Sequence, residues 1–208
     1  MKTDAELAEL FTTVKEWRTA GIDTQYQIIE TPDETILIFK ESDSKADWKT
    51  NLRFPKKPYR YMETHFYVHG GYLKEWKLVQ HAVMSNFLYA MPDKPITVVG
   101  WSYGGAMATL AMEALWHDFP YLRESLRLVT FGSPRVIGWF NFWRVKERWE
   151  NTTRYRNCSD FVTCVPFIFM GFHHVKKVNQ LGKRFCIFKV FWTGTYHRIA
   201  SYIEGLQF

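Results

Sequence analysis

The sequence is poor in cysteine: its 208 residues include three, Cys158, Cys164 and Cys186. An odd and sparse set of thiols does not make a disulfide framework, and without a C-x-x-C pair a zinc ribbon is not indicated. Neither disulfide bonds nor a structural metal ion are needed for stability, because a chain of this length can bury roughly 70% of its unfolded surface. We therefore predict a fold held together by its hydrophobic core, with no metal ion and no cofactor.

Long apolar runs are missing as well. The longest, 162–172, is interrupted by Pro166 and is far shorter than a membrane span. The first residues carry Asp4, Glu6 and Glu9, which break up the apolar core that a secretory signal peptide requires. These absences predict a soluble protein in a reducing, cytoplasmic location and without a transmembrane segment, with export by another route left open.

Acidic residues are outnumbered, 21 against 27 Lys and Arg, which leaves a formal charge of +6. Such a surplus suits nucleic acid, an anionic lipid surface or a merely solvated basic face. The sequence contains no recognised nucleic-acid-binding motif, so we expect no nucleic-acid partner. Peripheral contact with a lipid surface stays open beside the solvated face. The basic residues considered for that contact are Lys56, Lys57, Arg60, Lys176, Lys177, Lys183 and Arg184.

Hydrophobic periodicity divides the chain into alternating strands and helices. It predicts strands at 26–30, 35–39, 64–69, 96–99, 126–131, 153–157 and 184–191, with a polar stretch at 40–57. It predicts helices from Leu7 to Trp17, ending at Gly21, and at 72–89, 106–116 and 196–206. The strand–helix alternation from 64 to 131 indicates an α/β fold with a mostly parallel sheet and helices on both faces. Because no repeat or linker interrupts it, we predict a single domain, 1–208.

A nucleophile motif follows the strand at 96–99. Residues 100–105 are Gly-Trp-Ser-Tyr-Gly-Gly, a G-x-S-x-G that leads into a helix. In a nucleophile elbow the serine occupies a strained turn between strand and helix, and small neighbours let the two elements approach. The N-terminus of the helix that begins there favours developing negative charge. We therefore predict Ser102 as a catalytic nucleophile, against the alternative of a chance match.

A serine nucleophile needs a histidine base and a carboxylate that orients the histidine. In α/β enzymes with this elbow the acid follows the serine and the histidine comes last. Asp160 stands just after the strand at 153–157, at the strand end where α/β sites gather. His197 lies at the start of the last helix. We predict both as partners of Ser102, with a turn aspartate and a surface histidine as the alternatives.

Taken together, a series of motifs resembles the class 3 lipases, the fungal triacylglycerol lipase-like branch of the α/β hydrolases. The series extends from about Thr35 to Tyr202. It comprises 39–52 (similar to F-R-G-S/T and D/N-W-x-x-D/N-L), 68–72 (V-H-x-G-F/Y), 98–106 (the elbow), 130–136 (T-x-G-x-P-R-V), 157–166 (N-x-x-D-x-V-x-x-x-P), 171–174 (G-Y/F-x-H) and 197–202 (H-x-x-x-x-Y). The resemblance implies an α/β-hydrolase fold and the same triad of Ser102, Asp160 and His197.

The resemblance also implies an oxyanion hole and a lid. One oxyanion donor would be Ser42, and the other the backbone N–H of Tyr103, directly after the nucleophile. The segment 43–51 would be a mobile lid, and its polar character predicts weak interfacial activation. The sequence departs from the family pattern at Glu41, where the family has glycine, and at Trp101, where it usually has histidine.

Aromatic residues make up 18% of the sequence, which argues against disorder, and several lie near these motifs. An acyl chain needs an apolar groove, so we predict substrate contacts from side chains in the lid, beside the nucleophile and after the acid. Ordinary core packing is an equal alternative for those after the acid, and for the cluster at 139–143. The predicted substrate-binding residues are Trp48, Trp101, Val165, Phe167 and Phe169.

The function that these features indicate is a serine carboxylic-ester hydrolase. As a lipase or esterase it would cleave acylglycerol or related lipid esters through an acyl-Ser102 intermediate. Two alternatives remain beside it. One is a phospholipase that acts on anionic membrane lipid, and the other is a non-catalytic α/β-hydrolase scaffold that binds a lipid or a protein.

Overall fold

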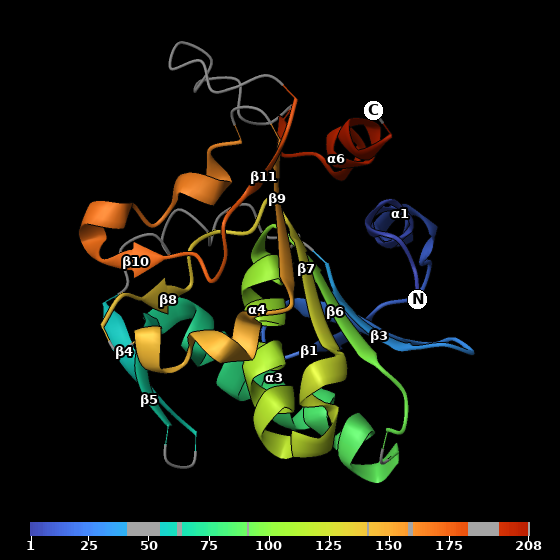
Figure 1. Ribbon diagram of the computed structural model, residues 1–208, viewed down its shortest axis with the longest axis horizontal. Helices are drawn as coiled ribbons and strands as arrows, with labels where there is room; N and C mark the ends of the chain where they lie inside the picture. Colours follow the sequence, from blue (N-terminus) through green and yellow to red (C-terminus); the bar gives the residue numbers. More distant parts are fainter. Residues whose placement is uncertain are drawn as a thin grey trace.

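The central sheet of the computed structural model runs through the middle of the molecule (Figure 1). The structure describes residues 1–40, 55–61, 64–90, 92–140, 142–157, 160–182 and 196–207. Within them the sheet has seven strands in the order β1 (Arg18–Ala20), β2 (Thr24–Glu30), β3 (Thr35–Phe39), β6 (Ile96–Trp101), β7 (Leu126–Phe131), β9 (Thr152–Asn157) and β11 (Asn179–Leu181). The predicted strand at 184–191 lies outside the described residues.

The sheet is parallel from β3 onward, through β6, β7, β9 and β11, whereas β1 and β2 are added antiparallel at one edge. Strand β3 is buried at every position, which is typical of a parallel strand covered on both faces. The mostly parallel sheet of the α/β prediction is therefore confirmed.

Helices cover both faces of this sheet, as predicted (Figure 1). Leu37 and Phe39 of β3 pack into the core beneath α3 (Gly70–Ala90) and α4 (Tyr103–Asp118). Ile36 and Ile38 alternate with them and pack into the other core, which contains residues of α1 (Asp4–Thr13) and α6 (Ile199–Leu206). The period-two alternation of a strand thus feeds two separate cores. None of the described helices is both long and apolar enough to cross a membrane.

A second, antiparallel sheet lies beside the first and corrects the sequence analysis. Its order is β10 (Phe172–His173), β8 (Ile137–Gly138), β5 (Thr64–His69) and β4 (Lys56–Tyr61). The strand–helix alternation from 64 to 131 predicts the strand at 64–69 as part of the mostly parallel sheet. Instead β5 forms an antiparallel hairpin with β4, which begins at the end of the predicted polar stretch, and β6 pairs with β3. The local pattern identifies 64–69 as a strand but does not specify its partner, because strand pairing depends on contacts between distant parts of the chain.

The first helix is shorter than predicted. It begins with a capping box between Thr3 and Glu6 and ends at Thr13, after which Val14 takes an extended conformation. The β-branched run at 12–14 has weak helix propensity, and both threonine hydroxyls bond the carbonyl of Glu9. Trp17 therefore lies outside the helix. Its ring stacks on Phe11, with centroids 6.5 Å apart, so the partly buried residue still packs against the core on the α1 side.

Short 3-10 helices make up much of the chain after α4. They are η1 (Pro120–Ser125), η2 (Phe142–Arg144), η3 (Lys146–Trp149), η4 (Val162–Cys164) and η5 (Ile168–Met170). Two of them, η4 and η5, follow the carboxyl end of β9, on the way to the small strand β10. Helix η4 directly follows the acid of the candidate site, Asp160, and η5 carries the exposed Ile168 and Phe169.

Candidate active site

Ser102 occupies the turn between β6 and α4. Its backbone has φ 56° and ψ −125°, and it is the one non-glycine residue with positive φ in the described part of the chain. Such a conformation costs on the order of 1–3 kcal/mol and persists only where the surroundings enforce it. Here the Ser102 N–H donates to the carbonyl of Phe131, over 2.9 Å. A side chain at Gly104 would overlap the carbonyl oxygen of Phe39, so the helix can approach β3 only with glycine there.

The structure brings the three predicted triad residues together, although they are far apart in sequence. His197 Nε2 lies 2.6 Å from Ser102 Oγ, and His197 Nδ1 lies 2.8 Å from Asp160 Oδ2. A carboxylate can only accept, so Nδ1 carries the proton and Nε2 accepts from the serine hydroxyl. This is the arrangement in which a histidine can take up the serine proton while a carboxylate holds its ring.

Asp160 is fully buried and is held from several sides. Its Oδ1 accepts from the backbone N–H of Val162 over 2.9 Å, and its Oδ2 accepts from His197 and from the hydroxyl of Tyr202. Burial and the neighbouring negative charge of Asp160 raise the pKa of Tyr202, so its phenol stays a donor. In the sequence, Tyr202 stands out only as the last residue of the H-x-x-x-x-Y motif, five residues after His197.

Gly132 lies against this cluster with φ +60°. A Cβ at this position would stand 2.8 Å from Asp160 Oδ2 and 3.0 Å from the Tyr202 hydroxyl. Two constraints therefore require glycine at this position. Its backbone is left-handed, and Asp160 and Tyr202 occupy the space that a side chain would need.

Trp101, which stays a predicted substrate contact, touches the histidine in the structure. Its indole Nε1 donates to the carbonyl of His197 over 3.0 Å, and its ring meets Phe11 of α1 edge-on at 6.0 Å. The side chain packs with the core on the α1 and α6 side of the sheet. The departure from the family's usual histidine at this position was the only sequence signal for such a role.

The predicted oxyanion donors fall partly outside the described residues. Tyr103 is the first residue of α4, so its backbone N–H is one of the amides that a helix leaves without an internal partner. Its side chain points to the other core, where its ring lies 5.8 Å from that of Tyr72 and burial raises the pKa of its phenol. Ser42 and Trp48, with the expected lid at 43–51, lie outside the described residues.

His174 supports the loop that carries the acid. Its Nε2–H donates to the carbonyl of Thr163 over 2.8 Å, and the Thr163 hydroxyl donates to the carbonyl of Asp160 over 2.8 Å. Burial, with the positive charge of Arg154, holds the pKa of His174 well below its usual range. The His174 side chain is therefore neutral and supports the loop through its hydrogen bond to Thr163. In the sequence, His174 stands out only as the histidine of the G-Y/F-x-H motif.

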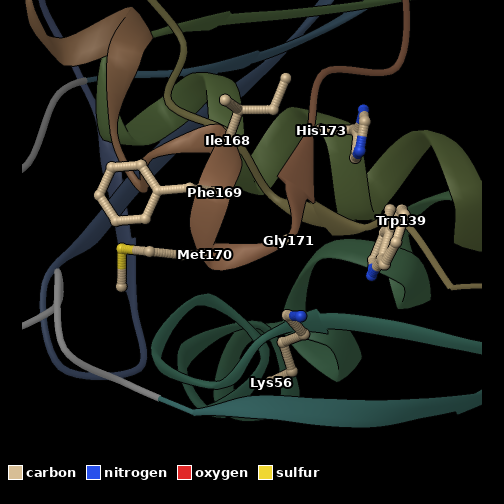
Figure 2. Close-up of a pocket in the computed structure, with 7 residues that line it drawn as sticks. All are labelled: Lys56, Trp139, Ile168, Phe169, Met170, Gly171 and His173. Atoms are coloured by element: carbon tan, nitrogen blue, oxygen red, sulfur yellow. The ribbon is translucent and has the colours of Figure 1, made fainter.

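The remaining predicted substrate residues do not gather around Trp101. Val165 is buried, whereas Phe167 and Phe169 are exposed and stack on each other with centroids 5.2 Å apart. Phe169 lines a cavity of about 450 Å³, drawn in Figure 2, whose lining includes neither Trp101 nor a triad residue. In the described part of the chain, no group of three or more His, Cys, Asp or Glu side chains could hold a metal ion.

The chain belongs to the class 3 lipase family, because the family model Lipase (class 3) matches residues 36–170. It is 32% identical over 145 residues to secreted mono- and diacylglycerol lipase 1 of Fusarium solani, which covers 68% of this chain and 42% of that protein. It is 31% identical over 109 residues to secreted mono- and diacylglycerol lipase A of Penicillium cyclopium, covering 50% of this chain and 34% of the relative. The chain thus spans less than half the length of either relative.

Solved structures agree on the fold. The Rhizomucor miehei triacylglyceride lipase superposes with a TM-score of 0.72 at 24% identity, over 81% of this chain and 66% of that one. The lipase from Rhizopus microsporus var. chinensis gives 0.66 at 26% identity, over 76% of this chain and 57% of its own. The predicted family and the α/β-hydrolase fold are confirmed.

The predicted cytoplasmic location is wrong. The relatives from Fusarium solani and Penicillium cyclopium are named as secreted lipases, which contradicts it. The composition of a folded domain does not report whether a protein is exported.

Proposed function

We propose that this chain is a serine hydrolase that cleaves the carboxylic esters of acylglycerols. The observation that supports this most is the continuous chain of contacts from Ser102 Oγ through the imidazole of His197 to the buried carboxylate of Asp160. The names of the family and of its secreted mono- and diacylglycerol lipase relatives support the substrate class. We also propose that residues 1–208 act as one domain.

In the proposed acylation, Ser102 Oγ attacks the ester carbonyl while His197 Nε2 takes up the hydroxyl proton. The Asp160 carboxylate stabilises the imidazolium that forms, without itself being protonated. The tetrahedral oxyanion would accept from the backbone N–H of Tyr103, and the family resemblance assigns the second donor to Ser42. Each such donor typically contributes a few kcal/mol to the transition state.

Collapse of this intermediate breaks the bond to the alcohol. His197 gives its proton to the leaving glycerol oxygen, and the acyl group stays on Ser102. A water molecule then attacks the acyl carbon while His197 Nε2 takes its proton. As the bond from that carbon to Ser102 Oγ breaks, His197 returns the proton to Oγ and a fatty acid leaves. The buried Tyr202 hydroxyl and the Val162 N–H keep Asp160 in its orientation throughout, because both donate to the carboxylate.

A fluorophosphonate probe tests the proposal directly. We expect the protein to be labelled and to hydrolyse diacylglycerol, and the Ser102→Ala variant to lose both properties. The matched control is Ser85→Ala, which removes a hydroxyl bonded to a helix carbonyl of α3. A folded protein that is not labelled would be the non-catalytic scaffold instead, and labelling with faster release of fatty acid from phospholipid than from diacylglycerol would favour the phospholipase.

A further inference from the structure

The cavity in Figure 2 combines apolar walls with a cation. Ile168, Phe169 and Met170 come from η5, Trp139 follows β8, and Lys56 opens β4. In Figure 2 the Lys56 side chain rises from β4 towards Gly171, with its nitrogen facing the hollow. A side chain at Gly171 would overlap the Lys56 ammonium, and the Phe172 ring lies 5.7 Å from it. The ammonium is thus seated against glycine and an aromatic ring at the cavity.

Large apolar side chains stand out into solvent around this cavity. Phe169 is 83% exposed, Trp139 64% and Ile168 60%. Phe167 is exposed as well and stacks on Phe169. We call these four residues the apolar rim. Single exposed apolar residues are ordinary, but a contiguous group of them at a cavity marks a surface that meets a partner.

The segments that carry the rim and the cavity hold charge of one sign. The segments 55–58, 137–144 and 166–173, which carry the rim and the cavity, contain Lys56, Lys57 and Arg144 and no Asp or Glu. The Arg144 guanidinium lies 4.8 Å from the ring centroid of Trp143, another exposed aromatic residue of these segments. A partner that fits this face is therefore apolar within and anionic at its surface.

The rim is fixed to the part of the molecule that holds the acid. The Arg135 backbone N–H donates to the carbonyl of Val165 over 2.8 Å, and its guanidinium donates to the carbonyl of Pro166 over 3.0 Å. The Trp139 N–H donates to the carbonyl of Gly171 over 3.1 Å. A surface docked at the rim would therefore be held in a constant relation to the loop that begins at Asp160.

We propose that this face docks the protein on an anionic phospholipid surface. The apolar rim enters the interface between headgroups and acyl chains, where tryptophan and phenylalanine are favoured, and Lys56 binds a headgroup phosphate. The inference rests on the proposed function, because it brings the ester hydrolase to substrate dissolved in that surface. It adds a docking site that lies apart from the triad contacts.

Vesicle co-sedimentation tests the docking in the Ser102→Ala background, where binding is measured without hydrolysis. The probes are phosphatidylcholine vesicles with and without phosphatidylglycerol. We expect binding to the anionic vesicles, weakened about tenfold by the double change Ile168→Ser and Phe169→Ser. Lys56→Gln should weaken it about fivefold, on anionic vesicles alone and more at low salt.

Matched controls come from α3, where Leu88 and Tyr89 are 53% and 90% exposed and Lys77 is exposed. Leu88→Ser with Tyr89→Ser, and Lys77→Gln, should bind like the background protein, and thermal unfolding checks that every variant folds. Equal losses in rim and control variants, binding that ignores anionic lipid, or no binding to either vesicle would overturn the docking proposal. Failure of the proposed function is seen separately, as absence of fluorophosphonate labelling of Ser102.

Discussion

Two regions of this protein use their aromatic residues in opposite ways. Under the triad, Phe131 of β7 is fully buried and its ring meets those of Phe11, Tyr155 and Tyr202 at 5.4–6.2 Å. Beside the four-stranded sheet, Phe169 and Trp139 stand mostly in solvent. The first group supports the geometry of buried polar atoms, whereas the second presents area to the outside. The high aromatic content of the chain therefore has two separate physical causes.

In the buried region, we expect the largest loss of activity from a substitution of the acid, Asp160. Asp160→Asn keeps the shape of the side chain, but an amide in place of the carboxylate no longer selects the proton on His197 Nδ1 or stabilises the imidazolium. We expect kcat on a soluble ester to fall by about 10⁴-fold with little change in KM. The exposed Asp93 provides the control Asp93→Asn. A loss of less than about tenfold would show that Asp160 is not the orienting acid.

Truncating one ring on each side compares the two uses of aromatic residues directly. Phe131→Ala removes a fully buried ring and should cost about 3–5 kcal/mol of unfolding free energy. Phe169→Ala removes an exposed ring and should cost less than about 0.5 kcal/mol. Urea unfolding followed by fluorescence measures both. Similar values for the two variants would mean that η5 is packed in solution and that the rim is part of the core.

His174, which supports the loop that carries Asp160, makes the free energy of unfolding depend on pH. The folded protein keeps His174 neutral because its pKa is lowered, whereas the unfolded chain protonates it below pH 6.5. The unfolded state then binds more protons, so stability falls with pH below that value, by at most about 1.4 kcal/mol per pH unit for this group.

We expect His174→Gln to be less stable than the unchanged protein at neutral pH and to lose less stability on acidification. Urea unfolding between pH 5 and pH 8 gives both curves. The matched change is His81→Gln, at an exposed position on α3, which should leave the pH dependence as it was. Parallel curves for His174→Gln and the unchanged protein would contradict a neutral, buried histidine.

The smallest expected effect concerns the link from β6 to the histidine. Trp101→Phe keeps an aromatic ring against Phe11 but removes the N–H that donates to His197. Loss of one such bond is worth about 0.5–1.5 kcal/mol, so we expect kcat to fall roughly two- to tenfold with KM unchanged. Trp101→His, which retains a ring N–H, should recover part of kcat. A change confined to KM would instead place Trp101 against the substrate.

Much of the site could be read from contiguous residues. A nucleophile elbow is a local device: an apolar strand, a strained serine and a helix follow one another within 96–118, so the pattern that predicts it is complete in the sequence. The order of serine, acid and histidine along the chain reflects strand-end positions, and Asp160 and His197 could be chosen on that ground. The family, the fold and most strands followed from the same local signals.

Only the tertiary structure decided which distant residues meet. Four contacts join segments whose local patterns do not specify their partners. They are the pairing of β5 with β4 and the hydrogen bonds from Trp101 to His197, from Tyr202 to Asp160 and from His174 to Thr163. The same holds for the rim, because an apolar run such as 167–170 reads alike whether it fills a core or faces solvent. Local physics specifies elements and turns, whereas contacts across the chain depend on where loop closure and core packing bring those elements together.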